Sequence, residues 1–87
     1  MRVAVKLVSP LNLVPGRKEP FAVELADGAT ATDLVPIVAE RVKHLPHIHG
    51  AVLAGGLMFL VNGAYSSPDV VLRDGDRVSV VLRISGI

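Results

Sequence analysis

The chain contains no cysteine, and this absence excludes several kinds of chemistry. A disulfide scaffold, a zinc site with cysteine ligands, a thiol nucleophile and a cysteine-ligated iron–sulfur cluster all need thiols that the chain cannot supply. Aromatic residues are few, with two Phe, one Tyr and no Trp, and the net charge is only +1. Proteins that bind nucleic acid usually carry a basic stripe, and single-strand binders add aromatic side chains that stack on bases. The composition therefore predicts no nucleic-acid partner.

Long hydrophobic runs are also absent. No apolar stretch approaches the ~18 residues that a membrane-spanning helix needs. The start of the chain carries Arg2 and Lys6 and has no apolar signal region behind them. These features predict no membrane association and a cytoplasmic location. Nevertheless 51% of the 87 residues are hydrophobic, which is high for a small protein that keeps all its surface in water. We therefore expect one domain, residues 1–87, with some apolar surface facing a partner.

The spacing of apolar residues predicts an α+β fold. Apolar residues alternate with other residues near both ends of the chain and after Pro20, and a period of two indicates half-buried strands. The apolar run 58–61, closed by Asn62-Gly63, predicts a further strand. Helical spacing from residue 30 onward predicts one main helix that ends at Pro46. Two strands, a helix and further strands indicate a mixed sheet of four to five strands packed on that helix. The residues of the apolar helix face are Leu34, Ile37, Val38, Val42 and Leu45.

Some outward positions of this sheet are uncharged. Ala4, Ala22 and Val81 fall on the face that the helix does not cover. Small apolar residues are common on strands, so this pattern can reflect nothing more than strand composition. It also fits a surface where a partner docks on the open face.

Other polar groups indicate turns and loops rather than catalysis. Three histidines, His44, His47 and His49, lie close together, but structural zinc sites usually add cysteines, so we interpret them as loop residues and predict no metal. Asp74 and Asp76 flank a glycine and are typical of a turn rather than of a catalytic carboxylate pair. Gly55-Gly56 lacks the spacing of a phosphate-binding loop and indicates a tight turn. Because no nucleophile–base pair is visible, we predict a protein that is not an enzyme and binds no cofactor.

Three motifs give the sequence a family resemblance. The segment 27–34 (DGATATDL) resembles a D/E-G-A-T-V-x-D-L helix entry, 61–63 (VNG) a V-N-G turn, and 72–78 (LRDGDRV) an L-x-D-G-D-x-V signature. In this order they resemble the MoaD/ThiS family of ubiquitin-like sulfur carriers over nearly the whole chain. The resemblance implies a β-grasp (ubiquitin-like) fold.

The resemblance also implies a carrier mechanism. In the family, a partner adenylyltransferase of the ubiquitin-activating type uses ATP to activate the C-terminal glycine carboxylate, and sulfur then replaces AMP. The thiocarboxylate donates its sulfur to molybdopterin, to the thiamine thiazole or to other acceptors. The implied partners are therefore an adenylyltransferase and a sulfur-accepting enzyme such as a molybdopterin synthase large subunit. The ATP would belong to the adenylyltransferase.

The end of the chain departs from the family pattern, because Ile87 stands where the family has its last glycine. A β-branched side chain beside the reacting carboxylate hinders both adenylation and passage through a narrow channel. Three explanations remain open. Ile87 is removed and Gly86 becomes the acyl-carrying terminus, or the partner accepts Ile87 itself, or the chain is a non-conjugating ubiquitin-like adaptor or binding subunit. We predict a carrier in molybdopterin biosynthesis whose projecting tail, 83–87, makes the partner contacts, with the sequence Arg83, Ile84, Ser85, Gly86, Ile87.

Overall fold

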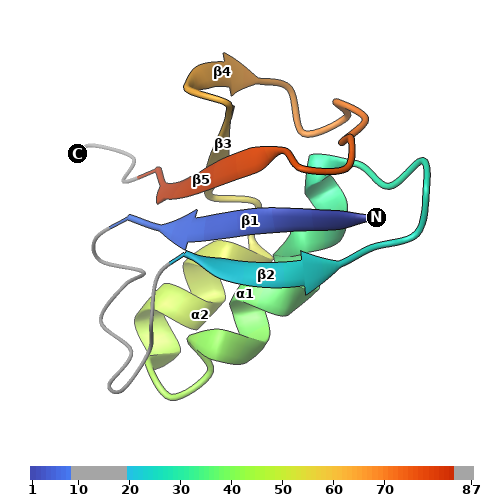
Figure 1. The fold of residues 1–87 in the computed structure, drawn as a ribbon. Helices are drawn as coiled ribbons and strands as arrows, with labels where there is room; N and C mark the ends of the chain where they lie inside the picture. Colours follow the sequence, from blue (N-terminus) through green and yellow to red (C-terminus); the bar gives the residue numbers. More distant parts are fainter. Residues whose placement is uncertain (9–19, 84–87) are drawn as a thin grey trace.

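A five-stranded mixed sheet with helices on one face forms the body of the protein (Figure 1). The computed structural model describes residues 1–8 and 20–83. The strand order is β2-β1-β5-β3-β4, and only β1 and β5 pair in parallel. This is the α+β, ubiquitin-like arrangement that the sequence predicts. The strands are β1 (Arg2–Leu7), β2 (Phe21–Glu24), β3 (Leu57–Val61), β4 (Ala64–Ser66) and β5 (Arg77–Leu82).

The two central strands form because their apolar residues occupy every second position. Val5 of β1 pairs with Val78 of β5, and Leu7 pairs with Val80. All four side chains are at most 2% exposed, so they form the centre of the core. Burying an aliphatic side chain of this size contributes about 1.5–3 kcal/mol, which makes the inward face of β1 and β5 a main source of stability.

The helical region differs from the single helix predicted over residues 30–45. A 3-10 turn, η1 (Ala31–Leu34), leads directly into α1 (Val35–Arg41), and a second helix, α2 (Pro46–Leu53), follows after a short turn. The prediction that Pro46 ends the helix is wrong, because α1 has already ended and Pro46 begins α2. Proline suits the first turn of a helix, where its missing N–H has no partner to lose.

The residue before this proline explains the break. Leu45 has φ −116° and ψ 85°, outside the helical region. A residue that precedes proline is pushed toward extended conformations, so the chain leaves one helix and starts another. His47 and His49 consequently lie on α2, and the prediction that they are loop residues is wrong. Both helices contribute to the core. Val38 and Ala39 of α1 and Val42 at its C-terminal end are buried there, as is Val52 of α2.

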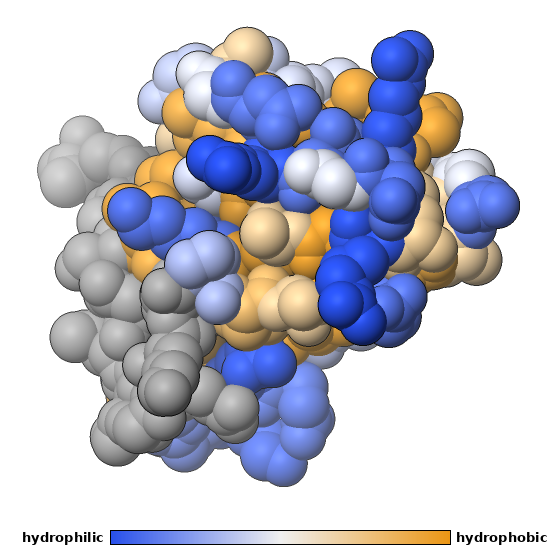
Figure 2. Space-filling view, viewed as in Figure 1, coloured by the Kyte–Doolittle hydropathy of each residue, from blue (hydrophilic) through white to orange (hydrophobic). Residues whose placement is uncertain are grey.

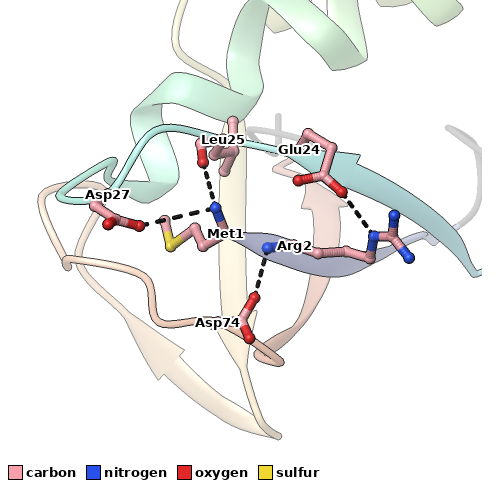
Figure 3. Close-up of polar contacts among 6 residues, drawn as sticks. All are labelled: Met1, Arg2, Glu24, Leu25, Asp27 and Asp74. Carbon is pink, nitrogen blue, oxygen red and sulfur yellow. Dashed lines mark hydrogen bonds and ion pairs between the residues drawn. The ribbon is translucent and has the colours of Figure 1, made fainter.

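Polar contacts hold the start of β1 to its neighbours (Figure 3). The terminal ammonium of Met1 donates to the carbonyl of Leu25 over 2.8 Å, and the amide of Arg2 donates to a carboxylate oxygen of Asp74 over 2.7 Å. Leu25 follows β2, and Asp74 lies in the turn before β5. One end of β1 is thereby connected to both flanking strands. Within the described residues, no helix has the length and apolar character needed to cross a membrane.

Candidate functional site

The face of the sheet that the helices leave open carries two of the predicted partner residues side by side. Ala4 of β1 pairs with Ala22 of β2, and Ala4 also pairs with Arg77 on its other side. Ala22 is exposed and Ala4 is half-buried. Next to them, the side chain of Arg2 donates to Glu24 over 2.7 Å, an exposed pair that is shown in Figure 3. This part of the open face therefore presents small methyl groups between charged side chains.

The third predicted residue, Val81, lies further along β5 and belongs to a separate apolar group. Val81 pairs with Met58 of β3, and Leu60 of β3 pairs with Tyr65 of β4. We name these four residues the open-face patch. Tyr65 is 72% exposed, whereas the other three are half-buried. In Figure 2, apolar side chains on this face lie between hydrophilic ones.

Sequence reasoning missed three members of this patch. Interpreted as one continuous apolar run, residues 58–61 give no indication of which side chains face outward. In the structure Phe59 is 2% exposed, while Met58 and Leu60 on either side of it are half-buried on the open face. Successive side chains of a strand point to opposite faces, but because residues 57–61 are all apolar the sequence does not indicate which of them face outward.

Positive charge surrounds the apolar parts of the open face. Lys6, Arg77 and Arg83 are exposed, and none of them forms an ion pair with another described residue. By contrast, the nearby carboxylates of Asp74 and Asp76 accept hydrogen bonds from backbone amides. A hollow of about 450 Å³ opens between the cations, lined by Ala4, Lys6, Pro20, Arg77, Val78 and Ser79. The face therefore offers apolar contact and uncompensated positive charge together.

The root of the predicted tail lies at the edge of the open-face patch. The amide of Arg83 donates to the carbonyl of Gly56 over 2.5 Å, directly after β5. Arg83 also lines a hollow of about 300 Å³ together with Met58 and Tyr65 of the patch. The other predicted tail residues, Ile84, Ser85, Gly86 and Ile87, lie outside the described residues. The projection of 83–87 from the domain therefore remains a prediction.

The motifs behind the family resemblance form turns in the structure. Asn62 has φ 52° and Gly63 has φ 88°, the left-handed pair that a tight hairpin requires between β3 and β4. The Asn62 side chain accepts from the Arg77 amide at 3.0 Å and donates to Asp76 at 3.0 Å. Asp76 also accepts from the amide of Arg73 at 2.8 Å. The predicted turn roles of Asn62-Gly63 and Asp76 are confirmed.

Titratable groups elsewhere do not form a site. In the described part of the chain, no three His, Cys, Asp or Glu residues are arranged to hold a metal ion. On the helical side, the Lys43 ammonium donates to the Glu40 carboxylate of α1 over 2.6 Å. This hydrogen bond, and after it the charge of Lys43, lowers the pKa of Glu40. The pair is exposed and lies away from the open face.

Several solved structures share this fold. A protein from Pyrococcus furiosus described as molybdopterin converting factor, subunit 1, is 28% identical, with a TM-score of 0.71, and the match covers 97% of this chain and 99% of that one. SAMP1 from Haloferax volcanii is 21% identical, with a TM-score of 0.72 and coverage of 99% of both chains. A protein–protein complex of subunits 1 and 2 of molybdopterin-converting factor from Helicobacter pylori 26695 includes a chain that is 21% identical, with a TM-score of 0.59 and 99% coverage of both chains. No curated protein matches the chain.

These comparisons define the class of the protein. The sheet order, the helices on one face and the structural neighbours make the chain a ubiquitin-like β-grasp protein. The model of the ThiS family matches residues 6–86, and the chain belongs to that family. It is therefore a member of a family of small ubiquitin-like carrier and modifier proteins.

Proposed function

We propose that this protein is a sulfur carrier that works through its C-terminal carboxylate. A partner adenylyltransferase would bind ATP, and the carboxylate oxygen would attack the α-phosphorus with release of pyrophosphate. A sulfur nucleophile at the sulfide oxidation level, supplied by a separate donor, would then attack the acyl carbon, form the C–S bond and expel AMP, which leaves a thiocarboxylate. The observation that carries this proposal is the ThiS family match, which extends to Gly86 and therefore includes the reacting end of the chain. Gly86 is the acyl-carrying terminus after loss of Ile87.

The short spacing between the sheet and Gly86 limits where the partner can dock. Gly86 is three residues beyond Arg83, and three extended residues span at most roughly 11 Å. The active site of the partner must therefore approach the edge of the sheet where β5 ends. The open-face patch lies at that edge and offers the apolar contact that a stable interface needs. With Lys6, Arg77 and Arg83 around it, the matching surface of the partner would be apolar and acidic.

We propose molybdopterin as the destination of the sulfur. The support is the 28% identity to the Pyrococcus furiosus protein that is described as subunit 1 of a molybdopterin converting factor. The second partner would then be a molybdopterin synthase large subunit. The chain would supply the carboxylate and the docking surface, and the partners would supply the catalysis and bind the ATP.

A second candidate is a non-conjugating ubiquitin-like adaptor. The observation in its favour is Ile87, a β-branched residue at the position of the reacting carboxylate. The adaptor would use the same open face but would never form an adenylate.

Mass spectrometry of the protein from its own host separates the two functions. A carrier shows loss of Ile87, replacement of one oxygen by sulfur, or both. The purified protein should also support ATP–pyrophosphate exchange by the adenylyltransferase of the same host. An intact, unmodified chain that supports no exchange, yet binds a partner tightly, would establish the adaptor instead.

Substitution of Val81 tests the docking surface. Val81→Asp places a negative charge in the open-face patch, beside the root of the tail, where we expect an acidic partner surface. The partner would bury this charge or place its own negative charge beside it, and both weaken binding. We therefore expect the KM for the carrier to rise about tenfold or more. Leu53→Asp is the matched control, because Leu53 is 61% exposed on α2, on the helical side. Equal KM values for the two variants would contradict docking at the patch.

A further inference from the structure

The C-terminal end of α2 is closed by two glycines that precede β3. Gly55 has φ +87°, and its amide donates to the carbonyl of Val52 over 3.2 Å. The amide of Gly56 donates to the carbonyl of Ala51 over 2.9 Å. These two bonds are the pair that defines a Schellman motif, in which a left-handed glycine ends a helix and satisfies its last carbonyls.

Gly56 connects this helix end to the root of the tail. Its N–H is bonded to Ala51 at the end of α2, and its C=O accepts the amide of Arg83, the first residue after β5. The two peptide units that flank Gly56 therefore link α2, the start of β3 and the point where the chain continues toward Gly86. Within the described residues, the Arg83 amide donates its hydrogen bond to this carbonyl of Gly56.

The space around Gly56 admits no side chain. A Cβ placed there would lie 2.8 Å from the carbonyl oxygen of Ala51, closer than real Cβ atoms approach backbone. Because the obstructing atom is main chain, the contact cannot be relieved by rotation of a side chain. Any residue other than glycine must push the end of α2 away from the sheet edge and disturb the bond to Arg83. Gly50, in the same helix, has open space instead, with no atom within 4 Å of the point that a Cβ would occupy.

We propose that Gly56 is a positioning residue for the proposed adenylation of the C-terminal carboxylate. It holds the amide of Arg83 against the end of α2, and so sets the direction in which the tail leaves the domain. This inference rests on the proposed carrier function. Gly86 is only three residues beyond Arg83, so a displacement of Arg83 is passed on to the reacting group. A displacement of about 1 Å in a reacting group can reduce turnover about a hundredfold, even when the substitution is far from the chemistry.

The test compares Gly56→Ala with Gly50→Ala and with the parent, all prepared without Ile87 so that each chain ends at Gly86, in ATP–pyrophosphate exchange by the host adenylyltransferase. For Gly56→Ala we expect kcat to fall about ten- to a hundredfold, with KM for the carrier within about twofold of the parent value, because the open-face patch is unchanged. Gly50→Ala should keep the parent kcat. Equal kcat values for the two variants, or a change in KM alone, would overturn the inference. No exchange with the parent chain would instead refute the carrier function itself.

A second pair of variants tests the same hydrogen bond by changing its donor, Arg83. This pair keeps the inference testable even if Gly56→Ala does not fold. Arg83→Pro deletes the donating N–H, whereas Arg83→Ala keeps it and removes the same charged side chain. If the bond to Gly56 positions the tail, Arg83→Pro should have a kcat at least about tenfold below that of Arg83→Ala, at similar KM. Indistinguishable kcat values for this pair would also overturn the inference. Circular dichroism of each variant establishes that it is folded before its kcat is compared.

Discussion

The two ends of β5 are held in different ways. At its first residue, the Arg77 amide donates to the side chain of Asn62, and Asp76 just before it accepts from two further donors. At its other end, the amide of Arg83 donates to the carbonyl of Gly56, and Arg83 lies beside the apolar open-face patch. Among the described residues, side-chain hydrogen bonds contribute at the first end, whereas the hydrogen bonds near the second end, from Val8 to Val80 and from Arg83 to Gly56, join main-chain groups.

This difference shows which property of the protein the family motifs indicate. The V-N-G and L-x-D-G-D-x-V segments meet at the first end of β5, where their polar side chains satisfy backbone amides. They therefore identify the fold, because this network sets the pairing of β3 with β5. The proposed chemistry belongs to the other end, where the reacting group is a main-chain carboxylate. Substitutions at the first end should change stability, and those at the second end should change turnover.

Asp76→Ala should give the largest loss of stability at the first end. It leaves the Arg73 amide and the Asn62 side chain without their acceptor, and hydrogen bonds to a charged group contribute about 1.5–3 kcal/mol. We expect the free energy of unfolding in urea to fall by about 2–3 kcal/mol, with an unchanged kcat for adenylation of the folded protein. Asp69→Ala is the control, because the Asp69 carboxylate accepts no hydrogen bond from another described residue. A kcat defect in Asp76→Ala as large as that of Gly56→Ala would remove the distinction between the two ends.

Gly63→Ala should have an intermediate effect. Gly63 has φ 88° and nothing within 4 Å of the point that a Cβ would occupy, so the substitution adds backbone strain without a steric clash. An L-residue held in the left-handed region costs about 1–2 kcal/mol, and we expect this decrease in the free energy of unfolding. Gly50→Ala should act in the opposite direction, raising stability by about 0.5–1 kcal/mol, because it replaces glycine within α2. Thermal unfolding of the two variants and the parent measures both changes in stability. If the two substitutions change the stability in the same direction, the assignment of strain to Gly63 is contradicted.

The smallest effect should come from Glu40, on a helix that belongs to neither end of β5. The hydrogen bond from Lys43 lowers the pKa of Glu40 in the folded protein below its ordinary value of 4.5. The unfolded chain therefore binds the proton more readily. The stabilisation by this pair is present above the unfolded-state pKa and is lost as the pH falls through the lowered folded-state pKa. Urea midpoints of the parent should decline slightly more than those of Glu40→Gln between about pH 6 and pH 3, and added salt should reduce the difference. If the urea midpoints of the two proteins decline equally with pH at low salt, the Glu40–Lys43 pair contributes nothing to stability.

Much of the fold follows from local patterns. The alternation in β1 and β5 places Val3, Val5, Val78 and Val80 in the core, and these residues are at most 1% exposed. Asn62-Gly63 predicts its hairpin because few residues other than glycine and asparagine adopt left-handed conformations. The helical region was less predictable, because Pro46 is compatible with the end of one helix and with the start of the next.

Residue type and spacing over a few positions are enough to predict the family, the strands, the turns and the chemistry that the absence of cysteine excludes. Two relations follow from the folded structure alone: Met58, Leu60 and Tyr65 join Val81 on the open face, and Gly56 lies against Arg83. Those relations join segments that are distant along the chain. They arise when β3 and β5 pair and α2 packs behind them, and no local pattern contains that geometry.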